Sequence, residues 1–564
     1  MKKKLITIML AVLMAASLYA YDGLMAGAGI RQITPTSDMY PLSWGPGNNR
    51  GFTFIGAAEN IYVRVIAISA KGDEASPEDT VLIIGFETGK GPYPPGMIAL
   101  LSERTGVKPE HIFWSTTHTH SAPEITNSNW KDFLDIEIRH DTRANEYSDL
   151  TRRNLARWGV MLEKQLVEAA EEAIGSMQPA EVALGTTESY INVNRDTPYA
   201  SNLTQNTYDP FGEKIPGTKE GFNGQGFSDK TLSVVEFRNR ETKAPIAFIT
   251  HYAMHNTLLY ANDYFNPAFN SAHGVKVATE EDIETGIYDP DNVDNTVLSG
   301  KLELNTAYCE PYKKNFRSIT ELSTASNTDG ETAANAAVHP DIGGLVSQYI
   351  ERKHEGAVAI WMSGFAGDQN PVLRNTMNFE SPYTGEVLEI PVDGGMLPAA
   401  TYYASIQFVD VQRAIKRIEE EDAFSSGTPV RMTWGKSTVK PIDELYYAPG
   451  STEGVPYSDI GLFMTVLSVG DITFAGVPNE PYNSIGAALR DRSVLGDAPT
   501  RNTLCIDQVW THEEERMGGG YFPDDAAILN NSYNWGKGVK YPTGVINDAY
   551  IELLERLWKE APEV

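Results

Sequence analysis

The hydrophobic and polar positions of this chain repeat with two periods. Short apolar runs bounded by turn residues are typical of β-strands, and they occur at residues 62–69, 81–86, 112–115, 232–237, 357–362, 465–469 and 472–475. The last two runs flank Gly470-Asp471, which predicts a tight hairpin turn. Between the runs lie segments with helical spacing, most clearly at about 150–174, where Gly175 follows as a stop signal, and again at 551–557. Strands that alternate with helices predict an α/β fold.

One long segment, at about 261–340, lacks these periods. It is rich in acidic residues, which cluster at 280–282 and 289–294. Calcium binding is one interpretation, but Val293 stands where an EF-hand-type loop needs an oxygen ligand. We therefore interpret the segment as a solvated acidic insertion.

The first twenty residues differ from the rest of the chain. Three lysines are followed by the apolar stretch 5–16 and by the small residues of 17–20, which is the pattern of a secretory signal peptide. We expect this peptide to be removed and the protein to be secreted or periplasmic. Later in the sequence we find no apolar run long enough for a transmembrane segment.

Charge and cysteine content narrow the possible partners. The 564 residues carry a formal net charge of −29, which argues against nucleic acid as a partner because phosphates are bound by clustered Lys and Arg. The oligomeric state is open. Cys309 and Cys505 are far apart in sequence and either form one disulfide or remain two buried thiols.

The segment 111–123 joins an apolar run to two histidines, His118 and His120. Side chains at i and i+2 of a strand point to the same face, so a strand through these residues would bring both rings to one cavity. Neutral imidazole is a good zinc ligand, and open α/β sheets bind ligands where their strands end. Taken alone, the pattern fits either a zinc site or two hydrogen-bonded histidines.

Two further metal-binding residue types follow strand-like runs. His251 follows the run 246–249, and it shares one face with His255 if the chain turns helical there. Glu480 follows the predicted hairpin, in a loop stiffened by Pro478 and Pro481. Two histidines and one glutamate leave an open position on zinc, which is the arrangement of catalytic sites.

At this point the sequence resembles the neutral/alkaline, non-lysosomal ceramidases. The block His-Thr-His-Ser-Ala-Pro at 118–123 is similar to that family's signature, and further blocks follow the family's order at 26–35, 192–199, 228–232 leading into 250–251, 364–371 and 477–480. The resemblance implies an α/β fold like the ceramidase N-terminal domain, a large mixed-sheet domain with flanking helices. It also implies that residues 21–564 form a single catalytic domain that contains the acidic insertion.

The resemblance assigns roles to six residues. It implies Zn2+ ligands at His118, His251 and Glu480, and a substrate pocket lined by His120, Arg195 and Tyr521. Zinc lowers the pKa of bound water to about 7 and polarises carbonyl groups. Arg195 and the Tyr521 hydroxyl are suited to donate hydrogen bonds to a developing oxyanion or to a substrate carboxylate.

The sequence also departs from the family pattern, and the departures argue against ceramide as the substrate. Asn370 stands where the family's loop has a serine, and an amide cannot replace that hydroxyl as nucleophile or proton relay. The family's tyrosine ligand falls near Val509, so His512 or Asp368 is left as its substitute. The stretch after Tyr521 is too short for the family's immunoglobulin-like C-terminal domain.

Three functional hypotheses follow. The first is an exported zinc-dependent amidohydrolase that cleaves a linear amide (N-acyl) bond of a small or lipid-like substrate, consistent with a role in lipid metabolism. Zinc-activated water would attack, and Asp368 or His120 would accept the proton. The second is a catalytically reduced protein that keeps the fold and binds a lipid, peptide or glycan. The third is a zinc hydrolase for another bond, such as a glycan N-acetyl group. Tyr533 and Trp535 would then stack on sugars, and the alternative is that they are ordinary core or turn aromatics.

Overall fold

The computed structural model describes most of the chain outside the N-terminal segment and the acidic insertion. The described residues are 21–40, 42–43, 52–57, 59–125, 128–136, 143–199, 217–259, 303–304, 334–372, 377–380, 387–390, 396–439, 445–447, 454–457, 459–491, 502–513, 520–530, 532, 534 and 541–564. The expected signal peptide, most of the acidic insertion, Cys309, Tyr533 and Trp535 lie outside these ranges.

Nine strands form one mixed sheet, in the order β14-β11-β10-β7-β1-β4-β5-β6-β25. The strand bounds are β1 Met25–Gln32, β4 Tyr62–Ser69, β5 Val81–Phe86, β6 Ile112–Thr116, β7 Gln178–Glu188, β10 Thr231–Asn239, β11 Pro245–Tyr252, β14 Val358–Ser363 and β25 Val509–Trp510. β5 is parallel to β6 and β11 is parallel to β14, whereas the other neighbours are antiparallel.

The sheet folds back on itself at the junction of β1 and β7. These strands pair at two positions, Met25 with Pro179 and Ala26 with Gln178. Beyond the junction the two halves of the sheet pack against each other, and Gly85 on β5 contacts Ile360 on β14 so closely that an added Cβ would lie 2.5 Å from Ile360 Cγ2. The folding-back explains how strands far apart in the sheet order contribute to one site.

A second sheet packs on the inner core formed by the two halves. Its order is β18-β21-β22-β24, with bounds Val430–Val439, Ile460–Val469, Ile472–Gly476 and Thr503–Ile506. Phe474 on β22 meets Phe113 on β6 edge to face, with ring centroids 6.1 Å apart. Apolar side chains of both sheets form one buried cluster.

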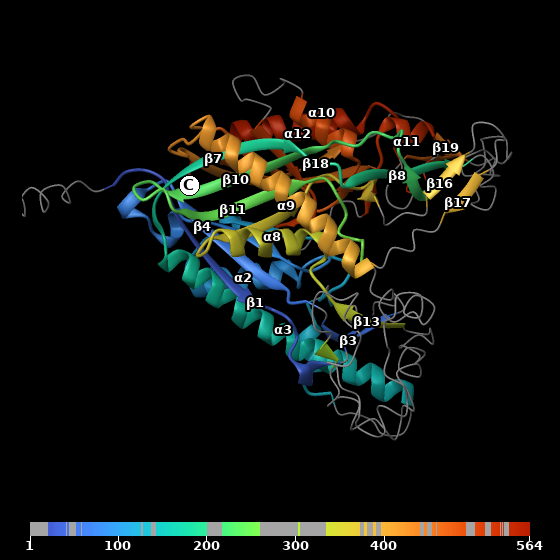
Figure 1. The fold of residues 1–564 in the computed structure, drawn as a ribbon, viewed down its shortest axis with the longest axis horizontal. Helices are drawn as coiled ribbons and strands as arrows, with labels where there is room; N and C mark the ends of the chain where they lie inside the picture. The colour runs from blue at the N-terminus through green and yellow to red at the C-terminus, as the bar shows by residue number, and fades with distance from the viewer. Residues whose placement is uncertain are drawn as a thin grey trace, which may run out of the picture.

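Helices cover the outer faces of the sheets (Figure 1). The half with β4 and β5 carries α2 (Pro94–Thr105) and α3 (Arg143–Gly175), and the half with β10 and β11 carries α8 (Asp341–Lys353) and α9 (Met396–Glu420). The second sheet carries α10 (Asn483–Asp491) and α12 (Ile546–Glu560). Helix α3 lies very close to β1, because a Cβ added at Gly29 would fall 2.1 Å from the Ala169 carbonyl oxygen.

Smaller elements complete the fold. A three-stranded sheet, β15-β8-β9, and the strand pair β23-β26 flank the candidate site. The bounds are β2 Leu42–Ser43, β3 Phe52–Ala57, β8 Asn192–Tyr199, β9 Gly217–Asn223, β12 Glu303–Leu304, β13 Ala334–Val338, β15 Gln369–Pro371, β16 Met377–Glu380, β17 Val387–Ile390, β19 Leu445–Tyr447, β20 Gly454–Pro456, β23 Glu480–Pro481, β26 Tyr521–Phe522 and α11 Asp525–Leu529.

The predicted mixed-sheet α/β architecture with flanking helices is confirmed. Each apolar run named above overlaps a strand, and Gly470 turns the β21-β22 hairpin with a φ of 61°. The helix expected at about 150–174 is longer at its N-terminal side and begins at Arg143. The segment after His251 does not turn helical, because β11 continues to Tyr252 and residues 253–259 contain no helix.

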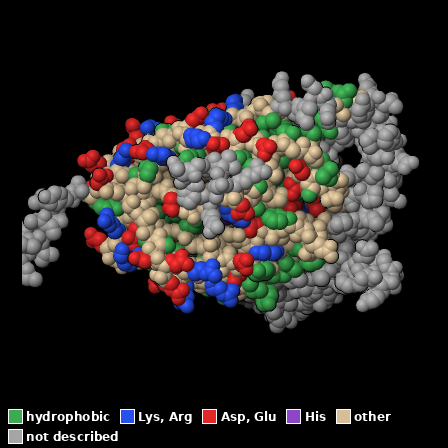
Figure 2. Space-filling model, turned by 90° about the horizontal axis from the view of Figure 1, so that it is seen from above, with side chains coloured by type: hydrophobic (Ala, Val, Ile, Leu, Met, Phe, Trp, Pro, Cys, Tyr) green, Lys and Arg blue, Asp and Glu red, His purple; other side chains and the backbone are tan. Residues whose placement is uncertain are grey.

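The described residues were compared with the requirements for a membrane-spanning helix and for a basic surface patch. Within them, no helix is both long and apolar enough to cross a membrane. On the face shown in Figure 2, Lys and Arg side chains are interspersed with Asp and Glu.

Candidate metal centre

His118 and His120 lie just beyond the end of β6. The strand ends at Thr116, and His118 has a φ of 58°, in the left-handed region that non-glycine residues seldom adopt. The expectation that both rings share one face of a strand is therefore wrong, because the strand stops before them. The turn still brings the rings together, with Nε2 of His120 3.3 Å from Nε2 of His118.

The His118 ring is fixed by a backbone carbonyl. Its Nδ1 lies 2.9 Å from the Gly89 oxygen, and a carbonyl can only accept, so Nδ1 carries the proton. The lone pair is then on Nε2, which lies 3.7 Å from Glu480 Oε2. Burial lowers the pKa of His118 to about 3, which keeps the imidazole neutral near pH 7.

His255 is fixed in the same way from the opposite side. It lies three residues beyond the end of β11, and its Nδ1 faces the carbonyl oxygens of Ala366 at 2.6 Å and Gln369 at 3.1 Å. Both oxygens are acceptors, so Nδ1 again carries the proton. Nε2 of His255 lies 3.0 Å from the same Oε2 atom of Glu480 that His118 faces.

Glu480 begins β23, in the loop that follows β22. Burial alone raises the pKa of this carboxyl, but the imidazoles of His118 and His255 outweigh burial and hold it well below its usual range. Glu480 is therefore a buried carboxylate, 8% exposed. The backbone of β23 pairs with β26 and sets Glu480 opposite Tyr521.

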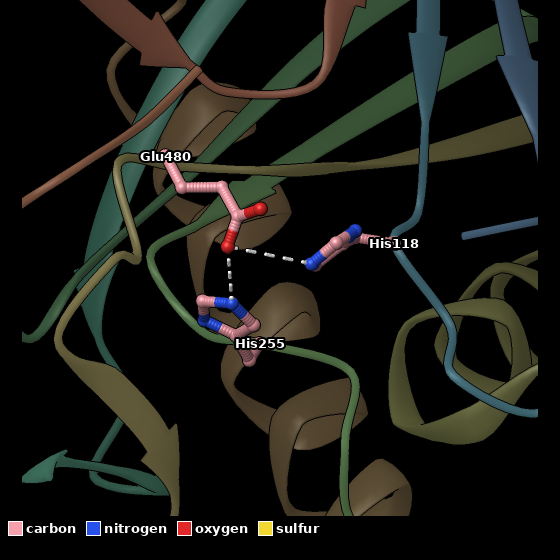
Figure 3. A group of neighbouring side chains, drawn as sticks. All are labelled: His118, His255 and Glu480. Carbon is pink, nitrogen blue, oxygen red and sulfur yellow. Dashed lines mark hydrogen bonds and ion pairs between the residues drawn. The ribbon is translucent and has the colours of Figure 1, made fainter. Parts of the chain in front are cut away.

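The three side chains form one buried group suited to a metal ion (Figure 3). One ligand atom from each lies within 4.8 Å of the others. The two imidazoles, each fixed at Nδ1 by a backbone carbonyl, direct Nε2 to the same carboxylate oxygen, so a cation placed between them would contact all three side chains. The separations of 3.0 and 3.7 Å bracket the roughly 3.4 Å expected between two ligands of a tetrahedral zinc with bonds of about 2.0–2.2 Å.

His251 lies outside this group. It is still within β11, and its Nε2 lies 2.9 Å from the carbonyl oxygen of Cys505 on β24. That contact occupies Nε2 of His251 with a backbone carbonyl, whereas the Nε2 atoms of His118 and His255 face Glu480. The structure thus differs from the expected set: the second histidine beside Glu480 is His255. Because β11 runs on to Tyr252, the turn into the site comes after His251.

Tyr521 and Arg195 extend the site away from the metal group. The Tyr521 ring is stacked near His255, with centroids 6.3 Å apart, and the Arg195 guanidinium lies 5.2 Å from the Tyr521 ring centre. Burial, and then the charge of Glu480, raise the pKa of the Tyr521 hydroxyl, so it stays a hydrogen-bond donor. Arg195 also donates to the carbonyl of Gly367 at 2.7 Å.

Asp368 is buried nearby but faces other partners. Its Oδ2 accepts from Asn194 Nδ2 at 2.7 Å, and its Oδ1 accepts from the backbone N–H of Asn483 at 2.8 Å. Burial raises the pKa of Asp368 to about 8. In the described part of the chain, no hydrogen bond or ion pair joins Asp368 to His118, His255 or Glu480.

Val509 and His512, which the sequence comparison placed near an expected tyrosine ligand, both lie away from the metal group. Val509 pairs with Ser115 on β6, and His512 packs edge to face on Trp434 with centroids 5.3 Å apart. Neither side chain belongs to the described metal group. The sequence offered no signal for the carbonyls of Gly89, Ala366 and Gln369, because any residue supplies such a group.

Comparisons with known proteins identify the fold. No protein-family model matches the sequence, and no curated protein matches it. A crystal structure of neutral ceramidase from Pseudomonas aeruginosa aligns with a TM-score of 0.54 and 13% identity over 96% of this chain and 76% of that chain. A structure of a ceramidase complexed with C2 aligns with a TM-score of 0.55 at the same identity and coverage. The chain thus has a ceramidase-like fold, as its resemblance implied.

Proposed function

We propose that this protein is a zinc-dependent hydrolase that cleaves an amide (N-acyl) bond, with His118, His255 and Glu480 as metal ligands. One observation carries the proposal. Two buried imidazoles are fixed by backbone carbonyls so that both direct Nε2 toward one oxygen of a buried carboxylate. A His-His-Glu set that leaves a position open is typical of catalytic zinc sites, and nitrogen and oxygen ligands suit zinc.

The side chains around the group fit acyl transfer. When bound, zinc lowers the pKa of water and polarises a carbonyl. His120 is the residue best placed to accept a proton, because its Nε2 lies 3.3 Å from the His118 ligand atom. The Tyr521 hydroxyl and the Arg195 guanidinium supply donors on the other side, suited to the oxygen that gains charge in the transition state.

Water is the nucleophile in this proposal, since position 370 carries no hydroxyl. The Asn370 side chain is buried, and its Oδ1 accepts from Arg195 Nη1 at 3.3 Å and from Thr257 Oγ1 at 3.2 Å. Asp368 is less suited than His120 to accept the proton, because both its oxygens face partners away from the metal group.

The proposal also covers the substrate class and the location of the protein. The ceramidase-like fold favours a lipid-like N-acyl substrate, and the N-terminal pattern favours export to the periplasm or beyond. A glycan N-acetyl group draws no support from the described residues, since Tyr533 and Trp535 lie outside them.

Metal analysis with a matched pair of variants tests the proposal. We expect about one zinc per chain in the wild type, loss of zinc in His255→Ala, and retention in His251→Ala, because of these two histidines it is His255 that contacts Glu480, whereas His251 contacts the Cys505 carbonyl. N-acyl substrates should be hydrolysed by the wild type and not by His118→Ala. A wild-type protein that takes up no zinc from a zinc-buffered solution would refute the proposal. Ligand binding that survives His118→Ala, without turnover, would instead favour a binding protein.

A further inference from the structure

A row of polar side chains leads from the metal group to the surface. The three-stranded sheet β15-β8-β9 carries Arg195, Asn370 and Glu220, whose side chains contact one another. Arg195 in turn lies over Tyr521, which stands opposite Glu480 in the β23-β26 pair. The row therefore begins at the metal group and ends at Glu220.

The chemistry of Asn370 fixes the direction of this row. Its Oδ1 must face Arg195, because a guanidinium can only donate, and its Nδ2 must face Glu220, because a carboxylate accepts. The distances agree, at 3.3 Å from Arg195 Nη1 to Oδ1 and 3.1 Å from Nδ2 to Glu220 Oε1. Asn370 thus joins a cation in the interior to an anion at the rim.

Exposure decides which charge a substrate meets first. The Arg195 side chain is 5% exposed, and its nearest nitrogen lies 3.7 Å from Glu220 Oε1, whereas the Glu220 side chain is 51% exposed. Arg195 also donates two hydrogen bonds to the Gly367 carbonyl, which holds its charge inward. A molecule that approaches along the row from solvent therefore meets a carboxylate before it meets the guanidinium.

We propose that Glu220 determines specificity by binding an ammonium group on the solvent-facing part of the substrate, so that N-acylated diamines are the preferred class. This inference rests on the proposed amide hydrolysis, because the acyl carbonyl must lie at the metal group for the amine portion to extend along the row. Both printed contacts of Glu220, from Asn370 Nδ2 at 3.1 Å and from Arg195 Nη1 at 3.7 Å, are made to Oε1, and a carboxylate with about four lone-pair positions accepts several donors at once. An anionic amine portion would be repelled at the same place.

Three amides that share one acyl chain test the inference. Their amine portions are ethylenediamine, ethanolamine and glycine, which are cationic, neutral and anionic at pH 7. We expect kcat/KM of the zinc-loaded wild type to fall in that order. Glu220→Gln keeps an oxygen for Asn370 and removes the charge, and it should reduce the cation-to-anion ratio about fivefold or more, through KM and not kcat.

A control variant separates this local effect from the net charge of the protein. Glu241 is exposed in the turn between β10 and β11, and Glu241→Gln removes the same charge there. The ratio of kcat/KM for the cationic amide to kcat/KM for the anionic amide should be the same in Glu241→Gln as in the wild type. A ratio unchanged in Glu220→Gln, or lowered equally in Glu241→Gln, would overturn the inference while leaving amide hydrolysis intact.

Failure of the proposed amide hydrolysis can be distinguished from failure of the inference about Glu220. If the zinc-loaded wild type hydrolyses none of the three amides, the proposed amide hydrolysis is refuted. Calorimetric measurement of the binding of the same amides then tests separately whether Glu220 binds an ammonium group. Tighter binding of the ammonium-bearing amide, lost in Glu220→Gln, would support the inference for a binding protein. Equal binding of the cationic and anionic amides, or no binding of either, would overturn it.

Discussion

His339 couples the stability of the fold to pH through a group that is not part of the metal site. It follows β13, it is 2% exposed, and its Nδ1 accepts a hydrogen bond of 2.8 Å from the backbone N–H of Asp341. Its own backbone N–H donates to the Ser121 carbonyl, so it lies beside the turn that carries His118 and His120. Burial lowers the pKa of His339 from 6.5 to about 3.

The size of the change in the free energy of unfolding with pH follows from these two pKa values of His339, 6.5 in the unfolded chain and about 3 in the folded protein. The folded protein binds the proton less tightly than the unfolded chain, so the stability contribution is complete above pH 6.5 and declines as the pH falls from 6.5 toward 3. Each pKa unit corresponds to about 1.36 kcal/mol. Between pH 7 and pH 5 the loss is therefore about 2 kcal/mol, and by pH 3 it reaches about 4 kcal/mol.

The perturbation is His339→Asn, which keeps an acceptor for the Asp341 N–H and does not titrate. Urea unfolding of both proteins at pH 7 and pH 5, with chelator present throughout so that metal release does not contribute, gives four free energies of unfolding. We expect the wild type to lose about 2 kcal/mol more than the variant between the two pH values. Equal losses in the two proteins would refute the reasoning, whatever the absolute stabilities.

Two other substitutions test packing and the polar row. Gly29→Ala should destabilise the fold by about 1–3 kcal/mol or more, because the new Cβ would lie 2.1 Å from the Ala169 carbonyl oxygen. Gly175→Ala, whose Cβ has no atom within 4 Å, serves as the control in thermal unfolding, and equal melting temperatures would contradict the packing argument. Asn370→Ser should lower kcat/KM about tenfold, because it removes the amide that holds Arg195. A rise in ceramide hydrolysis would instead show that the serine alone is missing.

The elements of the fold were predictable because strands and helices leave local periodic patterns. The runs at 62–69 and 81–86 coincide with β4 and β5 to the residue. The folding-back of the sheet was not predictable, since β1 and β7 pair at two positions and no local pattern records it. The same limit applies to the site, where Glu480 contacts His118 and His255, each more than two hundred positions earlier in the chain.

The choice between His251 and His255 shows what a sequence pattern lacks. Both follow an apolar run, and both fit a zinc ligand by residue type. What separates them is the residue at which β11 ends, because a ring within the strand reaches the Cys505 carbonyl and a ring three residues beyond it reaches Glu480. Strand ends are the least certain part of any pattern-based prediction, and a shift of a few residues exchanges one histidine for the other.

The two halves of the site are held by different kinds of contact, and this difference bears on how such a site diverges. His118 and His255 are oriented by the carbonyls of Gly89, Ala366 and Gln369, which persist when side chains change. The row that ends at Glu220 depends on side chains, among them the Asn370 amide that contacts both Arg195 and Glu220. Substitution can therefore alter the substrate while leaving both imidazole tautomers fixed. We accordingly expect metal content to be unaffected in Glu220→Gln even where substrate preference changes.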